Sequence, residues 1–202
     1  MRLNAGGTAW EVVGTPVFSD GTTSYNRIAF SGGIPYVVYR DAGNDNKATV
    51  MKLNAGGTAW EAVGTPGFSA GSAIYTDIAV NAGIPYVVYN AGGRARVVKL
   101  NAGGTAWEAV GTAGISEGAA AYTEVALNGM VPYVAYQDAG NSNKATVAKM
   151  NAGATGWEVV GTAGFSAGQA NFTDIAFHGT VPYVVYSDAA NGFKATVTKL
   201  NA

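Results

Sequence analysis

Four near-copies of a unit of about fifty residues fill this chain, and this repetition limits its possible folds more than any other feature of the sequence. Each unit begins at a tryptophan, and successive units are 50, 47 and 50 residues apart. The units start at Trp10, Trp60, Trp107 and Trp157 and cover approximately residues 10–59, 60–106, 107–156 and 157–202. We therefore expect a single domain over residues 1–202, in which neighbouring units bury their apolar faces against one another.

Each unit has the pattern of four short strands. In the second copy, residues 60–64, 75–80, 85–89 and 96–100 are rich in Val, Ile and Tyr, and Gly, Asn and Pro lie between them. Such runs are typical of strands, and no segment keeps the 3.6-residue period of a helix. Four short antiparallel strands, repeated radially, are the building unit of a β-propeller. The sequence predicts an all-β protein with almost no helix and with four four-stranded antiparallel blades.

Three motifs recur: W-E-x-V-G at the start of a unit, P-Y-V-x-Y in its middle, and K-A-T-V-x-K near its end in three of the four copies. With these motifs the whole chain resembles highly repetitive bacterial β-propeller repeat proteins of uncharacterised function. The resemblance implies the propeller fold and says little about activity. Residues 101–107 also faintly resemble the Asp-box turn of sialidases, but Ala102 stands where that motif has its aspartate. We interpret this likeness as a shared hairpin and not as shared chemistry.

The order of strands within a blade predicts how the ring closes. We place the 75–80 type of strand innermost, followed by the Pro-Tyr-Val strand, the Lys-Ala-Thr-Val strand and, outermost, the tryptophan strand. The chain starts near an outermost strand and ends after a third strand, so we expect residues 1–14 to complete the last blade. Two chains could instead give four blades each to an eight-bladed ring. We favour a monomer over a homodimer, because one chain holds every strand needed for closure.

Composition excludes several kinds of partner. Only 12% of the residues are charged and the formal net charge is −1, so no basic surface for nucleic acid is expected. No apolar stretch approaches the ~20 residues that cross a bilayer, and the absence of cysteine removes disulfides and thiolate–zinc sites. The N-terminus is repeat sequence without a secretory apolar region. We expect a cytoplasmic protein, or a secreted one whose leader has been removed.

Acidic and amide side chains recur in front of the innermost strands. We take Asn26, Asp77, Glu124 and Asp174 as equivalent positions that meet around the mouth of a central channel. A ring of oxygen ligands would suit a hard cation, so Ca²⁺ on the propeller axis is the one cofactor that we consider. In the alternative interpretation, each side chain accepts backbone N–H bonds and fixes the entry into its strand.

Two further sets of residues are candidates for ligand binding. Aromatic rings stand where the loop meets the innermost strand, and they could stack on a sugar: Tyr25, Tyr75, Tyr122 and Phe172. Carboxylates follow the Pro-Tyr-Val strand of three copies, and they could take sugar hydroxyls: Asp41, Asp138 and Asp188. The structural alternatives are packing between blades for the rings and Asx-type turns for the carboxylates.

Little in the sequence favours catalysis. His178 is the only histidine, no Gly-x-Ser-x-Gly motif occurs, and the arginines do not recur in register. Acids repeated once per blade indicate a scaffold, because an active site normally breaks symmetry. We therefore expect a non-enzymatic binding module with no catalytic residues, whose ligand is a glycan. Two alternatives remain: a scaffold that binds another protein, and a sialidase-like glycosidase.

Overall fold

The strands of this chain form one antiparallel sheet for each repeat. The computed structural model describes residues 1–111, 114–116 and 118–201, so that Ala202, the last residue of the fourth repeat, lies outside the described residues. We call the sheets blades 1 to 4 in chain order. Blades 1 to 3 have four strands each and blade 4 has three, with neighbours in the chain also neighbours in the sheet.

The bounds of the elements follow the repeat. Blade 1 contains β3 (Thr23–Ser31), β4 (Ile34–Asp41), β5 (Lys47–Leu53) and β6 (Trp60–Ala62). Blade 2 contains β7 (Ile74–Asn81), β8 (Ile84–Ala91), β9 (Arg94–Leu100) and β10 (Trp107–Ala109). Blade 3 contains β11 (Ala120–Asn128), β12 (Val131–Asp138), β13 (Lys144–Met150) and β14 (Trp157–Val159). Blade 4 contains β15 (Ala170–His178), β16 (Val181–Asp188) and β17 (Lys194–Lys199). A separate hairpin precedes them, β1 (Arg2–Leu3) and β2 (Trp10–Glu11).

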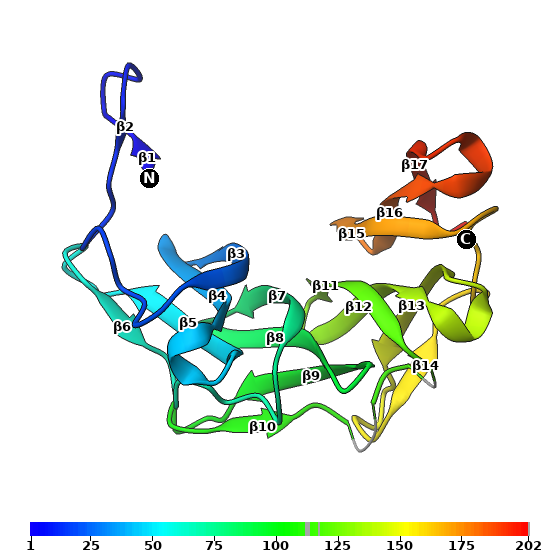
Figure 1. Ribbon diagram of the computed structural model, residues 1–202, viewed down its shortest axis with the longest axis horizontal. Helices are drawn as coiled ribbons and strands as arrows, with labels where there is room; N and C mark the ends of the chain where they lie inside the picture. The colour runs from blue at the N-terminus through cyan, green and yellow to red at the C-terminus, as the bar shows by residue number, and fades with distance from the viewer. Residues whose placement is uncertain (112–113, 117, 202) are drawn as a thin grey trace.

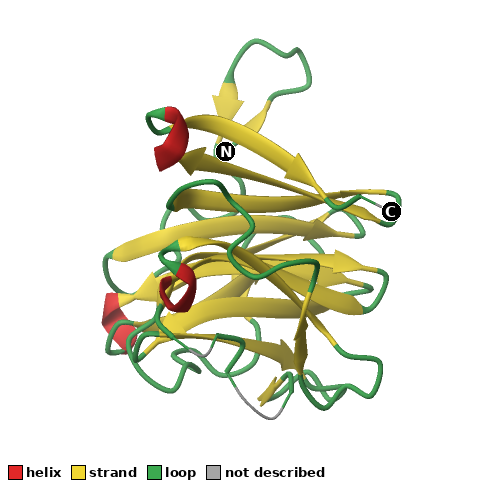
Figure 2. Ribbon diagram, turned by 90° about the vertical axis from the view of Figure 1, so that its right-hand side faces the viewer, coloured by secondary structure: helices red, strands yellow, loops and turns green. Residues whose placement is uncertain are grey.

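The blades stand side by side in an arc, with β3, β7, β11 and β15 on its inner side (Figure 1). This arrangement confirms the predicted all-β fold and the predicted strand order within a blade. Within the residues that the structure describes, helix is limited to three 3-10 turns, η1 (Ala42–Asn44), η2 (Ala139–Asn141) and η3 (Ala189–Asn191). They lie at the same end of the strands, as the red segments of Figure 2 show. No described helix is long and apolar enough to cross a membrane.

The apolar core is divided into layers between neighbouring blades. Between blades 1 and 2, Val38 and Val50 pack against Ile78 and Val87, and all four are buried. Alternation along each strand sends successive side chains to the two faces of a blade, so a central blade is apolar on both faces. The same repeat residues form the layers between blades 2 and 3 and between blades 3 and 4.

The tryptophan and the glycine of the W-E-x-V-G motif meet across consecutive blades. The indole of Trp107 stacks on Phe68, with ring centroids 4.2 Å apart, and its Nε1 donates to the Val63 carbonyl at 3.3 Å. Gly64 has φ +64°, and a Cβ there would lie 2.7 Å from the indole nitrogen. Glycine is therefore required both by the left-handed backbone and by the approach of the ring.

Closure of the ring differs from the expectation. Residues 1–14 do not complete blade 4: β2 pairs with β1, and this hairpin lies across the opening of the arc from β15, β16 and β17 (Figure 1). The reason is local pairing, since Leu3 opposes Trp10 in the same way that Leu53 opposes Trp60. The N-terminal strand thus already has a partner from its own segment.

Candidate functional site

The four inner strands each contain a β-bulge that places an aromatic residue in an unusual conformation. Pairing between β7 and β8 shifts between Ile74 and Asp77, and Tyr75 inside this bulge has φ 52°. A positive φ is strained for a bulky residue, and such strain is concentrated at functional sites. The equivalent residues of the other blades have the same conformation: Tyr25 (φ 54°), Tyr122 (φ 50°) and Phe172 (φ 53°).

The bulges bring these four rings into one contiguous row. Ring centroids are 5.4 Å apart for Tyr25 and Tyr75, 5.0 Å for Tyr75 and Tyr122, and 4.8 Å for Tyr122 and Phe172. Threonine hydroxyls bond to the backbone of the row. Thr76 donates to the carbonyl of Tyr25, and Thr123 and Thr173 repeat this contact one blade further on. The aromatic set predicted from the sequence is thus gathered in one place.

The predicted ring of oxygen ligands is corrected by one residue. Opposite Val88 in blade 2 stands Asp77, and opposite Val38 in blade 1 stands Arg27, not Asn26. Asn26 corresponds to Thr76 and is exposed. The equivalent positions are therefore Arg27, Asp77, Glu124 and Asp174, which are one cation and three carboxylates. This set is asymmetric, so the argument that a symmetric acid ring indicates a scaffold no longer applies.

Arg27 connects blade 1 to blades 2 and 3. Its Nη2 donates to Glu124 Oε1 at 2.7 Å, and its Nε lies 3.9 Å from Asp77 Oδ1. Asp77 Oδ2 also accepts the Val125 backbone N–H at 2.8 Å. Asp174 is exposed, and its Oδ1 accepts the Ile175 N–H at 2.7 Å. The arginine thus holds two carboxylates from different blades near one another.

Burial changes the protonation of the acidic pair. Desolvation, and then the charge of Asp77, raise the pKa of Glu124 to about 8, although the Arg27 guanidinium opposes the shift. Desolvation also raises the pKa of Asp77, against backbone N–H bonds from Val125 and Ile78. The hydrogen bond to Glu124 raises the pKa of Arg27 in turn. Near neutral pH the Asp77–Glu124 pair therefore holds a proton that an exposed pair would have lost.

Rings and charges line one pocket on the inner side of the arc. Its volume is about 250 Å³, and its lining comprises Tyr25, Arg27, Tyr75, Thr76, Tyr122, Glu124, Phe172, Thr173 and Asp174. Arg27, Thr76 and Thr173 were not among the candidates predicted from the sequence. Aligning the copies on their aromatic residue would have identified them. This alignment sets Tyr25-Asn26-Arg27 against Tyr75-Thr76-Asp77.

The second predicted set, Asp41, Asp138 and Asp188, lies elsewhere and is buried. Asp41 Oδ1 accepts the Gly43 N–H at 3.0 Å, and its Oδ2 accepts from Asn44 Nδ2 at 2.8 Å and Thr49 Oγ1 at 2.9 Å. Asp138 repeats these contacts in blade 3. The three carboxylates cap η1, η2 and η3, as the Asx-turn alternative expects. They do not line the pocket of aromatic rings.

The residues that the structure describes contain no group of three or more His, Cys, Asp or Glu side chains able to hold a metal ion. Axial Ca²⁺ remains a prediction from the sequence, with Arg27 in place of one of its expected oxygen ligands. His178, at the end of β15, is exposed and does not line the pocket.

No family model and no curated protein matches this sequence. Solved structures nevertheless share its fold. A GH43 glycoside hydrolase engineered to display both endo-xylanase and exo-arabinofuranosidase activity has a TM-score of 0.55 and 14% identity, over 92% of this chain and 43% of that one. RS223 β-xylosidase has a TM-score of 0.51 and 12% identity, over 87% of this chain and 69% of that one. An exo-1,5-α-L-arabinanase from a bovine ruminal metagenomic library has a TM-score of 0.49 and 16% identity, over 89% and 74%.

This finding corrects the expected function. The chain shares its fold with proteins named as glycoside hydrolases, and this finding contradicts the expectation of a non-catalytic, lectin-like binding module and the argument against an enzyme. Identities of 14% and 12% show the fold alone. The activity of this chain must therefore be argued from its own residues.

Proposed function

We propose that this chain is a glycoside hydrolase whose reaction centre is formed by Arg27, Asp77, Glu124 and Asp174. The observation that carries the proposal is Glu124, a buried carboxyl group with a raised pKa beside a second carboxylate and an arginine. Paired carboxyl groups in different environments are what hydrolysis of a glycosidic bond needs. Support also comes from the names of the fold neighbours, which describe hydrolysis of xylosides and arabinosides.

The environments of the carboxyl groups suggest their roles. Glu124, with a pKa of about 8, keeps its proton at neutral pH and is the general acid that protonates the departing oxygen. Asp174 is the exposed carboxylate of the pocket and takes a proton from the attacking water. The water oxygen bonds to the anomeric carbon as the bond to the departing oxygen breaks. Asp77 and Arg27 are positioning residues, because they set the pKa and the orientation of Glu124.

The volume of the pocket suggests a small substrate unit. Its volume of about 250 Å³ is below the ~300–1,000 Å³ of sites for drug-sized ligands, so about one sugar residue fits. The row of Tyr25, Tyr75, Tyr122 and Phe172 offers ring faces to the C–H groups of such a sugar. Pentosides are the first substrates to test, given the names of the fold neighbours.

The test measures hydrolysis of aryl xylosides, arabinofuranosides and hexosides by the wild-type chain and by Glu124→Gln. Loss of a general acid typically costs 10²–10⁴-fold in rate, and the loss should be largest for substrates with a poor leaving group. Glu108→Gln is the matched control, because Glu108 lies on β10, is paired with Lys99 at 3.2 Å and is exposed. This control should keep full activity.

Two results would contradict the proposal. One is a wild-type chain that releases no sugar from any aryl glycoside or from xylan and arabinan. The other is a Glu124→Gln variant as active as Glu108→Gln on substrates with poor leaving groups.

A further inference from the structure

The two ends of the arc expose the surfaces that are buried between neighbouring blades inside it. Ile28 of blade 1 is 59% exposed, whereas its equivalent Ile78 is 4% exposed. At the other end, Val197 of blade 4 is 65% exposed, whereas its equivalent Val147 is 4% exposed. These paired faces pack together three times within the chain. The two end faces are therefore complementary to each other in shape and in chemistry.

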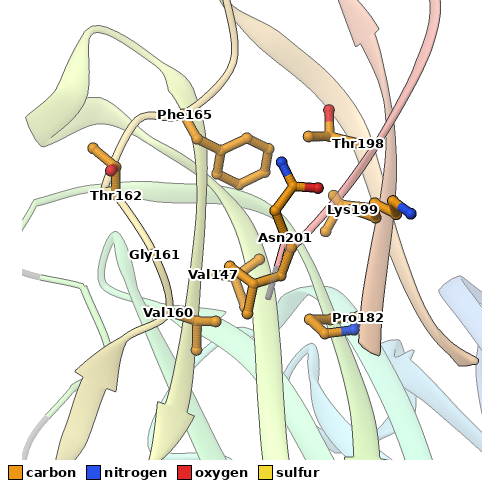
Figure 3. Close-up of a pocket in the computed structure, with 11 residues that line it drawn as sticks. Val147, Val160, Gly161, Thr162, Phe165, Pro182, Thr198, Lys199 and Asn201 are labelled. Atoms are coloured by element: carbon orange, nitrogen blue, oxygen red, sulfur yellow. The ribbon is translucent and has the colours of Figure 1, made fainter. Parts of the chain in front are cut away.

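An empty tryptophan slot lies beside the exposed face of blade 4. Three of the four V-G pairs of the W-E-x-V-G motif contact the tryptophan of the next repeat, whose indole N–H donates to the valine carbonyl. The pairs are Trp60 with Val13, Trp107 with Val63 and Trp157 with Val110. The fourth pair is Val160-Gly161, which lines a cavity of about 150 Å³ together with Phe165 and Leu200. Figure 3 shows Val160, Gly161 and Phe165 on one side of it and Pro182, Thr198 and Lys199 on the other. An apolar cavity of about this size can hold a benzene ring.

One tryptophan of the chain has no such slot. Trp10 is 69% exposed, although it occupies the same place in its repeat as the other three. The missing fourth strand of blade 4 would carry a tryptophan opposite Leu200 and a glutamate opposite Lys199, by analogy with Trp107 and Glu108 on β10. Strand β2 has this sequence, Trp10-Glu11. Lys–Glu pairs at 3.2 Å join these strands in blades 1, 2 and 3, so Glu11 and Lys199 also match in charge.

Trp10 cannot reach the slot of its own chain by moving alone. The Val13 carbonyl accepts the indole N–H of Trp60 at 2.9 Å, which fixes this point to blade 1. Val13 follows Trp10 by three positions, which gives a reach of about 10 Å when the chain is fully extended. Blade 1 and blade 4 lie across the opening of the arc from one another (Figure 1). Docking within one chain would thus require all three packed interfaces between blades to tighten together.

We propose that the slot at Val160, Phe165 and Leu200 binds Trp10 of a second copy of this chain. The β2 strand of that copy leaves its two-residue pairing with β1 and completes blade 4, and its Ile28 face covers the Val197 face. Strand β1 is easily replaced, because β17 and its continuation offer Lys199-Leu200-Asn201 in place of Arg2-Leu3-Asn4. This head-to-tail contact joins two copies and covers the Val197 face of one with the Ile28 face of the other.

The test is the mass of the chain in solution, measured by sedimentation over a range of concentrations. One copy has a mass of 20.5 kDa, and a dimer has twice that mass. Trp10→Ala should raise the dissociation constant of the dimer at least about thirty-fold, the loss expected of a buried tryptophan anchor. Val197→Asp should do the same from the other side of the interface. Val131→Asp is the matched control, since Val131 is also exposed but lies at the start of β12 in blade 3 and does not line the slot.

Emission of Trp10, isolated by comparison with Trp10→Phe, adds a second readout. A dimer that both interface variants dissociate, with Trp10 emission shifted to the blue as it forms, supports the proposal. A monomer at all concentrations with water-exposed Trp10 overturns it. A monomer with buried Trp10 also overturns it, because the chain then closes on itself. A dimer unaffected by both variants overturns it as well. None of these results depends on whether the chain hydrolyses glycosides.

Discussion

Replacement of Trp107 by alanine should destabilise the fold strongly, because this side chain joins blades 1 and 2. The indole stacks on Phe68 at 4.2 Å, belongs to the core layer with Val63, and donates a hydrogen bond to the Val63 carbonyl. Truncation of a buried aromatic residue to alanine costs about 3–5 kcal/mol, and the Val63 carbonyl loses a bond worth about 1 kcal/mol. Since Trp107 is only half-buried, we expect the lower part of this range, about 3–4 kcal/mol.

Thermal unfolding followed by calorimetry measures this effect. For a chain of this length, 1 kcal/mol corresponds to about 2–4 °C, so Tm should fall by roughly 6–16 °C. Trp10→Ala is the matched control, because Trp10 has the same place in the repeat but is exposed. At concentrations where the chain is monomeric, this control should change the free energy of unfolding by less than about 0.5 kcal/mol. Equal Tm values for Trp107→Ala and Trp10→Ala would refute the packing argument.

Three further predictions concern the pocket, the loops and the glycines. The raised pKa of Glu124 means that the native state holds a proton more tightly than the unfolded state, so the free energy of unfolding should fall as pH rises from about 4.5 to about 8. Glu124→Gln should reduce that fall, which urea titrations at pH 5 and pH 9 would measure; an unchanged slope would contradict the assignment. Asp41→Ala removes two hydrogen bonds to η1 and one to Thr49, and should cost about 2–4 kcal/mol and speed proteolysis of this loop, whereas Asp45→Asn, at an exposed position with φ 55°, should not. Gly64→Ala forces a Cβ toward Trp107 and should lower Tm clearly more than Gly129→Ala, which has a similar φ (+62°) but open space around it; equal Tm losses would show that the approach of the indole does not require glycine.

The strands and their order could be predicted from the sequence because they depend on short-range signals. A short run of Val and Tyr between glycine-containing turns defines β8, and similar signals recur in every copy. Repetition then places equivalent strands at equivalent distances from the axis. The Asx-turn alternative for Asp41 was equally local, since an aspartate that caps a turn needs only the next few residues.

The composition of the site was harder to predict because a bulge hides its register. The side chain of Asn26 has an oxygen that could bind a cation, whereas that of Arg27 has none. Matching the copies by side-chain chemistry therefore selected Asn26, although Arg27 is the residue in register with Asp77. The contact between Arg27 and Glu124 spans 97 residues and depends on the curvature of the arc. The sequence pattern of a single repeat does not specify how strongly the arc curves. The contact between Arg27 and Glu124 was therefore visible only in three dimensions, although aligning the copies on their aromatic residues puts Arg27 in register with Asp77.

The likeness of the three interfaces between blades has a consequence for how such a gene can change. A deletion or duplication of one repeat by recombination leaves neighbouring blades with nearly the same contacts, wherever in the repeat the exchange occurs. Packing therefore tolerates a change in the number of repeats. The pocket does not, because Arg27 and Glu124 each occur in one copy only. Loss of the first repeat would remove Arg27 from the pocket and loss of the third would remove Glu124, even though the remaining blades could still pack against one another.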